Sequence, residues 1–252
     1  MQAIGIIPAR YASSRFPGKP LVNISGRSMI QRVYERAIQC PLLDEVVVAT
    51  DDQRIFDHVS LFGKAVMTNP GHLSGTDRCK EALDQLNTSE KYSGNDIVVN
   101  IQGDEPFIDP EQIRQLIRSF SDPDRHIISL KKEIRSQEDI QNPNVVKVVC
   151  DHSGNALYFS RYPIPFIREE SLTPTPPNTH FKHIGMYGYR VRALKEIVAL
   201  PAGRLGQLES LEQLRWLEYG YKIYLEITEL ESISIDTPED LAKIPANPDE
   251  TA

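Results

Sequence analysis

Apolar and polar residues follow two different rhythms along the first half of the chain. Continuous apolar runs, typical of strands buried on both faces, occur at 3–8, 45–50, 65–68 and 96–103. Stretches with apolar residues every three or four positions predict helices at 28–40, 51–63, 77–86 and 110–120. Strands separated by helices of this length form parallel crossovers. The pattern therefore predicts an α/β protein with a mostly parallel sheet and helices on both faces.

The second half of the chain has a different pattern. Strands are predicted at 144–160 (a pair joined by a turn at 153–155), 181–190, 221–228 and the start of 232–241. An amphipathic helix is predicted at 208–220, and another at the end of 232–241. The segment 162–180 holds five of the 18 prolines, which predicts a long loop. No repeat or linker interrupts the chain, so we expect one domain over 1–252.

Composition narrows the class of protein. The chain has 28 Lys and Arg residues against 35 Asp and Glu, a formal net charge of −7, which argues against nucleic-acid binding as the main function. No run is apolar for long enough to span a bilayer, and the first residues lack the basic and apolar regions of a signal peptide. Three cysteines without a CxxC pair are typical of reduced thiols. We expect a cytoplasmic protein with no nucleic-acid or membrane partner.

Three cations gather in one loop of this acidic chain. Arg10, Arg15 and Lys19 follow the first predicted strand in "IIPARYASSRFPGKPL". The loop matches neither the dinucleotide fingerprint nor the P-loop pattern. Ligands of parallel sheets bind at the carboxyl ends of the strands, where Arg and Lys suit a polyphosphate. A single Arg would favour a solvated basic loop, but three cations at a strand end favour phosphate.

Carboxylates follow two other predicted strands. In "VVNIQGDEP", Asp104 and Glu105 come directly after the apolar run, and Asp236 follows "SISI" near the end of the chain. Beside a polyphosphate, such carboxylates favour Mg²⁺, which takes one or two protein carboxylates plus phosphate oxygens. For Asp236 alone the better reading is a helix N-cap before Thr237; its pairing with Asp104 makes it a ligand candidate.

The histidines and serines indicate neither a metal site nor a nucleophilic catalytic site. His180 and His183 are three apart in a predicted strand, so they face opposite sides and form no metal pair. No Ser–His–Asp arrangement is evident. The residues alone therefore predict a Mg²⁺-dependent enzyme that acts on a nucleoside triphosphate.

The order of the motifs resembles one enzyme family. The shared blocks are "IPARYASSRFPGKPL", "VVATDD", "SGTDR", "VNIQGDEP", "NPNVVKVV", "ALYFSR", "HIGMYGYR", "LEQLR" and "DTPEDL". Over about residues 3–243 the chain resembles 3-deoxy-manno-octulosonate cytidylyltransferases, also called CMP-Kdo synthetases. The proline-rich loop and the tail after Ile244 resemble them least.

This resemblance implies a reaction and a fold. CTP and the eight-carbon sugar acid Kdo would give CMP-Kdo and pyrophosphate with Mg²⁺, for lipopolysaccharide biosynthesis. The fold implied is a three-layer α/β/α nucleotide-diphospho-sugar transferase-like fold, in a homodimer. Residues 1–125 would mainly bind the nucleotide, and 126–245 would mainly bind the sugar acid and form the dimer.

The matching motifs imply roles for individual residues. The triphosphate would be held by Arg10, Arg15 and Lys19. Cytosine and ribose would lie against Pro8, Ala9, Ser74, Gly75 and Arg78, with Gln102 at the border between nucleotide and sugar. Asp104 and Asp236 would hold Mg²⁺, and with Lys19 and Arg10 they would form the catalytic group. The sugar-acid pocket would consist of Gln102, Arg161, His183, Tyr189, Glu212 and Gln213.

Three alternatives remain open at this point. The sibling enzyme that activates sialic acid with CTP shares the cationic loop, although "QGDEP", "HIGMYGYR" and "LEQLR" favour Kdo. A sugar-1-phosphate nucleotidylyltransferase would have a more glycine-rich loop. A non-catalytic nucleotide-binding regulator on the same fold is disfavoured because Lys19, Asp104 and Asp236 are all present.

Overall fold

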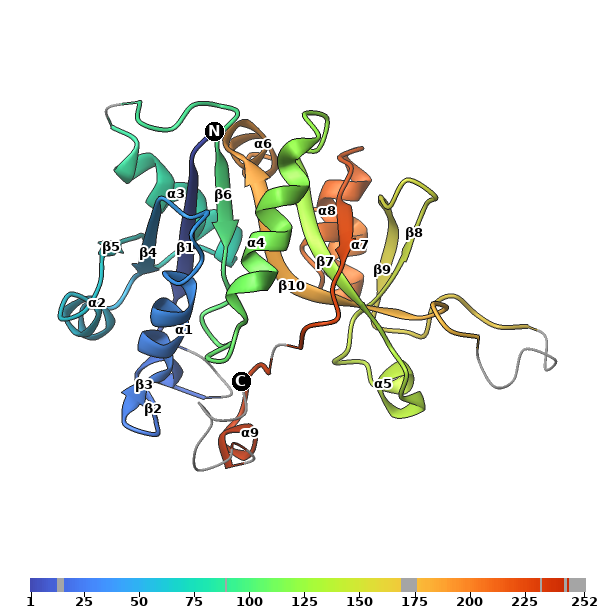
Figure 1. Cartoon of the computed structure of the whole chain (residues 1–252), viewed down its shortest axis with the longest axis horizontal. Coiled ribbons are helices and arrows are strands. Elements are labelled where there is room, and N and C mark those ends of the chain that lie inside the picture. The colour runs from blue at the N-terminus through green and yellow to red at the C-terminus, as the bar shows by residue number, and fades with distance from the viewer. Residues whose placement is uncertain (13–15, 89, 169–175, 232, 243, 245–252) are drawn as a thin grey trace.

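The computed structural model describes residues 1–12, 16–88, 90–168, 176–231, 233–242 and 244 (Figure 1). Its strands are β1 (Ala3–Ala9), β2 (Asn23–Ile24), β3 (Arg27–Ser28), β4 (Glu45–Thr50), β5 (Ala65–Met67), β6 (Ile97–Asn100), β7 (Ile127–Glu133), β8 (Lys147–Cys150), β9 (Ala156–Ser160), β10 (Phe181–Arg190) and β11 (Tyr224–Ile227). Its α-helices are α1 (Met29–Ala37), α2 (Gln53–Val59), α3 (Gly75–Leu86), α4 (Pro110–Arg118), α5 (Gln137–Gln141), α6 (Val191–Val198), α7 (Arg204–Glu209), α8 (Gln213–Glu218) and α9 (Pro238–Ala242). Two 3-10 helices are η1 (Lys19–Leu21) and η2 (Ser119–Ser121).

One sheet crosses the molecule in the strand order β11-β7-β10-β6-β1-β4-β5, with β8 and β9 attached beside β10. The pairs β1–β4, β1–β6, β4–β5 and β11–β7 are parallel, whereas β10 runs antiparallel to β6 and β7. The prediction of a mostly parallel sheet is confirmed. Because β6 pairs directly with β10, the first and second halves of the chain share this sheet.

Helices cover both faces of the sheet (Figure 1). On β1, Ile4 and Ile6 pack on one face in a core shared with α3, α6 and α8. Ile7 and Ala9 of the same strand pack on the other face with α1, α2 and α4. Successive side chains of a strand point to opposite faces, so a strand that is apolar throughout must be covered on both. The predicted three-layer α/β/α class is confirmed.

Several predictions for the second half need correction. The predicted helix at 208–220 is two short helices, α7 and α8, separated at Ser210, whose φ is 53°. The strand predicted at the start of 232–241 does not form among the described residues 233–235. There the Ile235 N–H donates to the carbonyl of Asp104 at 2.9 Å. This segment therefore pairs with the loop at Asp104 through a single hydrogen bond and does not join the sheet as a strand.

Strand β7 is absent from the sequence-based prediction. Its sequence, IISLKKE, ends in two lysines and a glutamate, which mask the apolar signal. Lys131 is nevertheless buried, with its ammonium 4.8 Å from the ring centroid of Phe181. Within the described ranges, no helix combines the length and the apolar character that crossing a membrane requires.

Candidate active site

The carboxyl ends of β1 and β6 meet at one edge of the sheet and line two adjoining pockets. The first, about 170 Å³, is lined by Pro8, Ala9, Arg10, Lys19, Pro20, Gln102, Gly103, Asp104 and Asp236. The second, about 180 Å³, is lined by Pro8, Ala9, Arg10, His72, Leu73, Ser74, Gly75, Arg78 and Gln102. Residues from five separate stretches of sequence therefore surround one space, as expected at strand ends of a parallel sheet.

Close packing of two loops shapes the first pocket. A Cβ added at Gly103 would lie 2.8 Å from the carbonyl oxygen of Pro8, closer than side chains are tolerated. Only glycine therefore lets the loop after β6 approach the end of β1. The next residue, Asp104, is thereby held beside the loop that carries Lys19.

Lys19 bridges the two carboxylates that are predicted to act as a pair, Asp104 and Asp236. Its Nζ lies 2.8 Å from Oδ2 of Asp104 and 3.1 Å from Oδ1 of Asp236. The three side chains are 13%, 28% and 37% exposed, so the cluster stands at the pocket wall in contact with solvent. One cation is thus already shared by two carboxylates 132 residues apart in the chain.

A small hydrophobic cluster carries Asp236 to this position. Ile235 is fully buried with Ile24 and Met29, and its N–H donates to the Asp104 carbonyl. The hydroxyl of Thr237 accepts a hydrogen bond from the Asp240 N–H, as an N-cap side chain does, while the Asp236 carboxylate contacts Lys19. The geometry therefore supports a site role for Asp236 beyond capping.

The donor set suits Mg²⁺ bound together with a nucleotide. Asp104 and Asp236 converge on one cationic atom, which is the arrangement that two carboxylate ligands need. In the described part of the chain, no group of three or more His, Cys, Asp or Glu side chains is placed to hold a metal. Mg²⁺ commonly binds through one or two carboxylates plus substrate phosphates and water. The residues present fit that mode.

Arg78 and Arg10 differ in their surroundings. Arg78 is 4% exposed and donates to Oδ2 of Asp51 at 2.8 Å and to the Thr68 hydroxyl, which fixes the start of α3 against the ends of β4 and β5. Arg10 is exposed at the mouth of both pockets and, among the described residues, makes no ion pair. Its guanidinium is available to an anion.

Glu212 joins the second half of the chain to the second pocket. Its carboxylate accepts hydrogen bonds from the hydroxyls of Ser74 and Thr76, both at 2.9 Å, and lies 3.2 Å from Nη2 of Arg215. Burial raises the pKa of Glu212, and the two hydroxyls partly offset this. Ser74 also caps α3 in a capping box with Asp77.

Unpartnered polar atoms lie beside Glu212. The hydroxyl of Tyr187 and Oδ1 of Asn100 are buried without a hydrogen-bond partner within the described structure, whereas the buried hydroxyl of Tyr189 lies near the side chains of Thr76 and Asn100. Tyr187 pairs with Asn100 across β10 and β6, and the two tyrosine rings stack at 5.9 Å. Burial raises the pKa of both tyrosines, so they are neutral donors. Orphaned buried groups are costly unless a ligand or water completes them.

The other predicted sugar-acid residues lie further from the pockets. His183 is partly buried, and its ring packs on those of Phe159 and Tyr187 at 5.1 and 5.2 Å. The Arg161 side chain donates to the backbone carbonyls of Pro143, Glu209 and Ser210. Gln213 is buried at the start of α8. Through these contacts Arg161 connects the end of β9 to the turn before α8.

Matches to known proteins agree with this geometry. A family model described as cytidylyltransferase covers residues 4–223. A 3-deoxy-manno-octulosonate cytidylyltransferase of Parabacteroides distasonis is 53% identical over 249 residues, which is 96% of each chain. The chain belongs to the 3-deoxy-manno-octulosonate cytidylyltransferase family. A member from Thermodesulfovibrio yellowstonii is also 53% identical, over 245 residues and 96% of each chain.

Solved structures extend the comparison with this family. A CMP:2-keto-3-deoxy-manno-octonic acid synthetase complexed with CTP matches 100% of both chains, with a TM-score of 0.89 and 40% identity. A putative glucose-1-phosphate thymidylyltransferase from Bacillus anthracis, with a TM-score of 0.63 and 18% identity, covers 97% of this chain and 94% of its own. The second similarity concerns the fold alone. The family resemblance drawn from the sequence is confirmed.

The structure brings most of the predicted site residues together. The pockets contain Pro8, Ala9, Arg10, Lys19, Ser74, Gly75, Arg78, Gln102, Asp104 and Asp236. Arg15 lies outside the described residues. Arg161, His183, Tyr189, Glu212 and Gln213 do not line either pocket among the residues described; Glu212 reaches one through Ser74. The roles of all these residues stay predictions.

Several polar residues of this region were not predicted from the sequence. His72, to which no site role was assigned from the sequence, lines the second pocket and contacts Glu81. Asn100 ends an otherwise apolar strand, and Tyr187 shares a strand face with Tyr189, so both carried a signal that was overlooked. Thr76 carried none, since a threonine in the first turn of a helix is ordinary.

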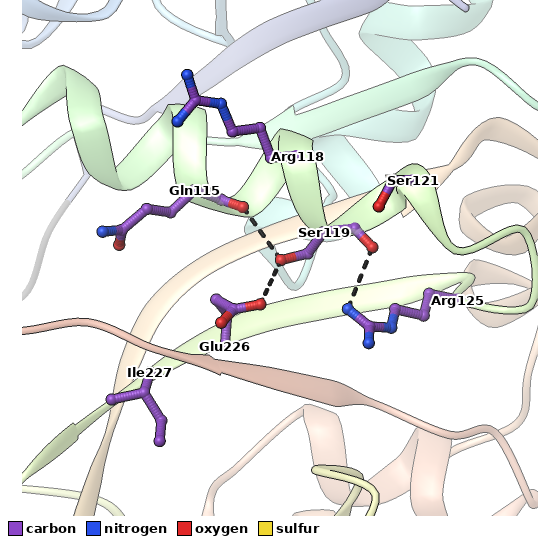
Figure 2. Close-up of a pocket in the computed structure, with 7 residues that line it drawn as sticks. All are labelled: Gln115, Arg118, Ser119, Ser121, Arg125, Glu226 and Ile227. Carbon is purple, nitrogen blue, oxygen red and sulfur yellow. Dashed lines mark hydrogen bonds between the residues drawn. The ribbon is translucent and has the colours of Figure 1, made fainter.

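A larger hollow of about 320 Å³ lies elsewhere, between the end of α4 and the edge strand β11 (Figure 2). In it the Ser119 hydroxyl contacts Glu226 at 2.6 Å, and Arg125 donates to the Ser119 carbonyl at 3.3 Å. Arg125 also pairs with Asp122 and lies 3.4 Å from the ring centroid of Tyr224. These groups largely satisfy one another, so size alone does not make this hollow the active site.

Proposed function

We propose that this protein transfers CMP from CTP to the anomeric hydroxyl of 3-deoxy-D-manno-octulosonate (Kdo), giving CMP-Kdo and pyrophosphate. The observation that carries the proposal is the convergence of Lys19, Asp104 and Asp236 beside two adjoining pockets. Family membership supports the substrates, because the relatives are named for Kdo and a solved relative is complexed with CTP.

The nucleotide would lie across both pockets. Arg10 and Lys19 would hold the triphosphate and offset the charge of the departing pyrophosphate, with Arg15 as a third cation. Cytosine and ribose would lie against Pro8, Ala9, Ser74, Gly75, Arg78 and Gln102. Support comes from the exposed guanidinium of Arg10 at the shared mouth of the pockets.

Asp104 and Asp236 would hold Mg²⁺ together with phosphate oxygens. Bound Mg²⁺ would supply positive charge that stabilises the phosphates and polarises the attacking hydroxyl. Lys19, whose ammonium neutralises both carboxylates in the structure, would then pair with the triphosphate. The chain's own contribution is mostly the positioning of reactants and the compensation of charge.

The sugar acid would bind on the side of the pockets formed by the second half of the chain. Gln102, Tyr189 and Glu212 would contact its hydroxyls and carboxylate, with His183 beyond them and Arg161 and Gln213 supporting the wall. The buried, unpartnered hydroxyl of Tyr187 supports this placement, since a polyhydroxylated ligand would complete its hydrogen bonds.

Pyrophosphate release tests the proposed reaction. We expect release with CTP, Mg²⁺ and Kdo, no release with sialic acid, and loss of release when a chelator removes the metal. Release with sialic acid alone would assign the chain to the sibling activity. Binding of CTP with no turnover of either sugar acid would favour a regulator.

Asp104→Asn tests the metal assignment. The substitution keeps the shape of the side chain but removes one of two charged ligands, so we expect a folded protein that has lost nearly all turnover. Melting temperature and near-UV circular dichroism report the fold. Equal activity in a folded Asp104→Asn protein would contradict the assignment of Asp104 to Mg²⁺.

Assembly and location follow the same proposal. Residues 1–125 would mainly bind the nucleotide, and 126–245 would bind the sugar acid and form a homodimer in the cytoplasm, supplying lipopolysaccharide biosynthesis. Exposed apolar side chains near the end of the sheet, Leu157, Tyr162 and Phe166, support a contact surface in the second half. Light scattering of wild type against Leu157→Glu measures the assembly; a wild-type monomer would contradict it.

A further inference from the structure

Strand β10 is irregular next to the active site. Its ladder with β7 pairs Ile184 with Leu130 and then Tyr187 with Ser129. Between these two pairs β10 advances by three residues and β7 by one. This bulge contains Gly185, whose carbonyl accepts a hydrogen bond from Nε2 of Gln102 at 2.7 Å. Gln102 lines both pockets. The bulge therefore connects strand β10 to the pocket wall.

Ser129 lies at the centre of the bulge. It is fully buried, and its hydroxyl oxygen lies 3.0 Å from the carbonyl of Ile184, 2.7 Å from that of Met186 and 2.9 Å from Nε2 of His183. One hydroxyl thus contacts three groups of the irregular strand. Neither Ser129 nor the bulge was expected from the sequence.

The number of available protons decides which of these atoms donate hydrogen bonds and which accept them. A hydroxyl has one hydrogen to donate, and carbonyl oxygens only accept. Two carbonyls at 2.7 and 3.0 Å would repel a serine oxygen that turned its hydrogen away from both, so the hydrogen points to them. Ser129 must then accept from His183, which requires the proton of the ring to reside on Nε2.

His183 carries one ring proton at neutral pH. Burial lowers its pKa to about 3, so the imidazole is neutral. With Nε2 protonated, Nδ1 has a free lone pair. Among the described residues, no hydrogen bond to Nδ1 of His183 is found. The rings of Phe159 and Tyr187 hold the plane of the imidazole, so its acceptor points in one direction.

We propose that Ser129 is a positioning residue that holds His183 in the Nε2–H tautomer, so that Nδ1 accepts a hydrogen bond from a hydroxyl of the sugar acid. This inference rests on the proposed function, because it takes Kdo as the ligand. It adds a specificity element: a neutral acceptor with fixed direction, which recognises a hydroxyl donor. Ser129 itself touches no substrate.

Steady-state kinetics test the link between the two residues. Ser129→Ala leaves the tautomer unfixed, and we expect the KM for Kdo to rise about tenfold, at the lower end of the effect of removing a histidine's orienting partner. The KM for CTP should change less than about twofold. Ser119→Ala is the matched control, because Ser119 is also buried and bonds a carbonyl and a carboxylate far from the pockets.

A double variant separates positioning from simple loss of packing. If Ser129 acts through His183, adding Ser129→Ala to His183→Ala should change the KM for Kdo by less than about twofold, since interacting residues are not additive. Full additivity of the two changes would overturn the proposal. So would an equal rise in the KM for both substrates, which would indicate general loosening of the bulge.

The tautomer itself is measured by NMR on protein with ¹⁵N-labelled histidine, with the His183 signals assigned by comparison with His183→Gln. We expect Nε2 protonated and Nδ1 unprotonated in wild type, and a mixture in Ser129→Ala. A wild-type ring protonated on Nδ1 would overturn the proposal. This readout needs no turnover, so an enzyme inactive on Kdo would contradict the proposed function while the tautomer is still decided.

Discussion

Ile235→Ala tests whether Asp236 depends on the cluster that anchors it. The C-terminal segment, residues 233–242, is fastened by a fully buried Ile235, by the hydrogen bond from its N–H to the Asp104 carbonyl, and by the contact of Asp236 with Lys19. Partly buried Leu241 and Ile244 add to the cluster. If these anchors hold the segment, weakening them should release Asp236 from the pocket.

The estimated free energies favour release of the segment 233–242 when Ile235 is truncated. Burial of the isoleucine contributes about 1.5–3 kcal/mol, the backbone hydrogen bond about 0.5–1.5 kcal/mol, and the partly exposed ion pair at most about 1 kcal/mol. Ordering each residue of the segment costs about 1–2 kcal/mol, so its net free energy of docking is small. Ile235→Ala removes three carbon atoms, about 2.4 kcal/mol at ~0.8 kcal/mol each. The docking constant should therefore fall roughly 50-fold.

Activity and stability should respond differently. We expect kcat/KM for CTP to fall by about 5- to 50-fold in Ile235→Ala, because the site loses Asp236 most of the time. The melting temperature should change little, since the segment docks locally. Ile197→Ala in α6 is the matched control: Ile197 is also fully buried, but in the main core, so its loss should cost about 2–5 kcal/mol of global stability with little change in kcat/KM.

Two results would refute this reasoning. Full activity in Ile235→Ala, with the segment shown by proteolysis to be undocked, would mean that Asp236 is not needed in the site. A fall in melting temperature as large as that of Ile197→Ala would mean that Ile235 belongs to the global core. The assay is pyrophosphate release at saturating Kdo, with the melting temperature followed by circular dichroism.

Three further predictions concern charge and packing. Lys19→Ala should cost about 2–4 kcal/mol of transition-state stabilisation, or roughly 30- to 700-fold in kcat/KM, whereas Lys91→Ala, which also loses a partly exposed ion pair, should leave kcat/KM unchanged; equal effects would contradict a role for Lys19. Gly188→Ala should lower the melting temperature by roughly 2–10 °C, because its Cβ would lie 2.7 Å from the Phe120 ring; an unchanged value would mean that the core yields freely. Burial raises the pKa of Glu45, but hydrogen bonds from Lys and Tyr side chains outweigh it and lower the pKa to about 2, from 4.5. Glu45→Gln should therefore be less stable than wild type above about pH 4.5, and the difference should vanish as the pH falls to about 2; a difference in denaturation midpoint that persists at pH 2 would contradict it.

The strands and helices of the first half were predictable from the sequence. The runs 3–8 and 45–50 correspond closely to β1 and β4, because continuous apolar residues can be buried only in a sheet covered on both faces. The sequence also placed Lys19 and Asp104 at one edge of the sheet, since each follows a parallel strand and such strands end together. Local pattern and the geometry of parallel strands suffice for these conclusions.

Other features depended on contacts between distant residues. Residues 233–235 have the alternation of a strand, yet the available partner is the loop at Asp104 and not a sheet edge, so burial of Ile235 decides their path. Strand β7 was hidden because Lys131 is buried against an aromatic ring that a linear pattern does not reveal.

The sequence by itself determined the fold class, the family and the charged groups of the pockets. Only the tertiary structure decided that Lys19 lies between Asp104 and Asp236, that Glu212 reaches the second pocket through Ser74, and that Ser129 organises the bulge beside His183. The physical reason is the distance along the chain over which each kind of information acts. Hydrophobic periodicity is a local property of the chain, whereas a hydrogen bond or ion pair forms wherever packing brings two groups within about 3 Å, at any separation in sequence.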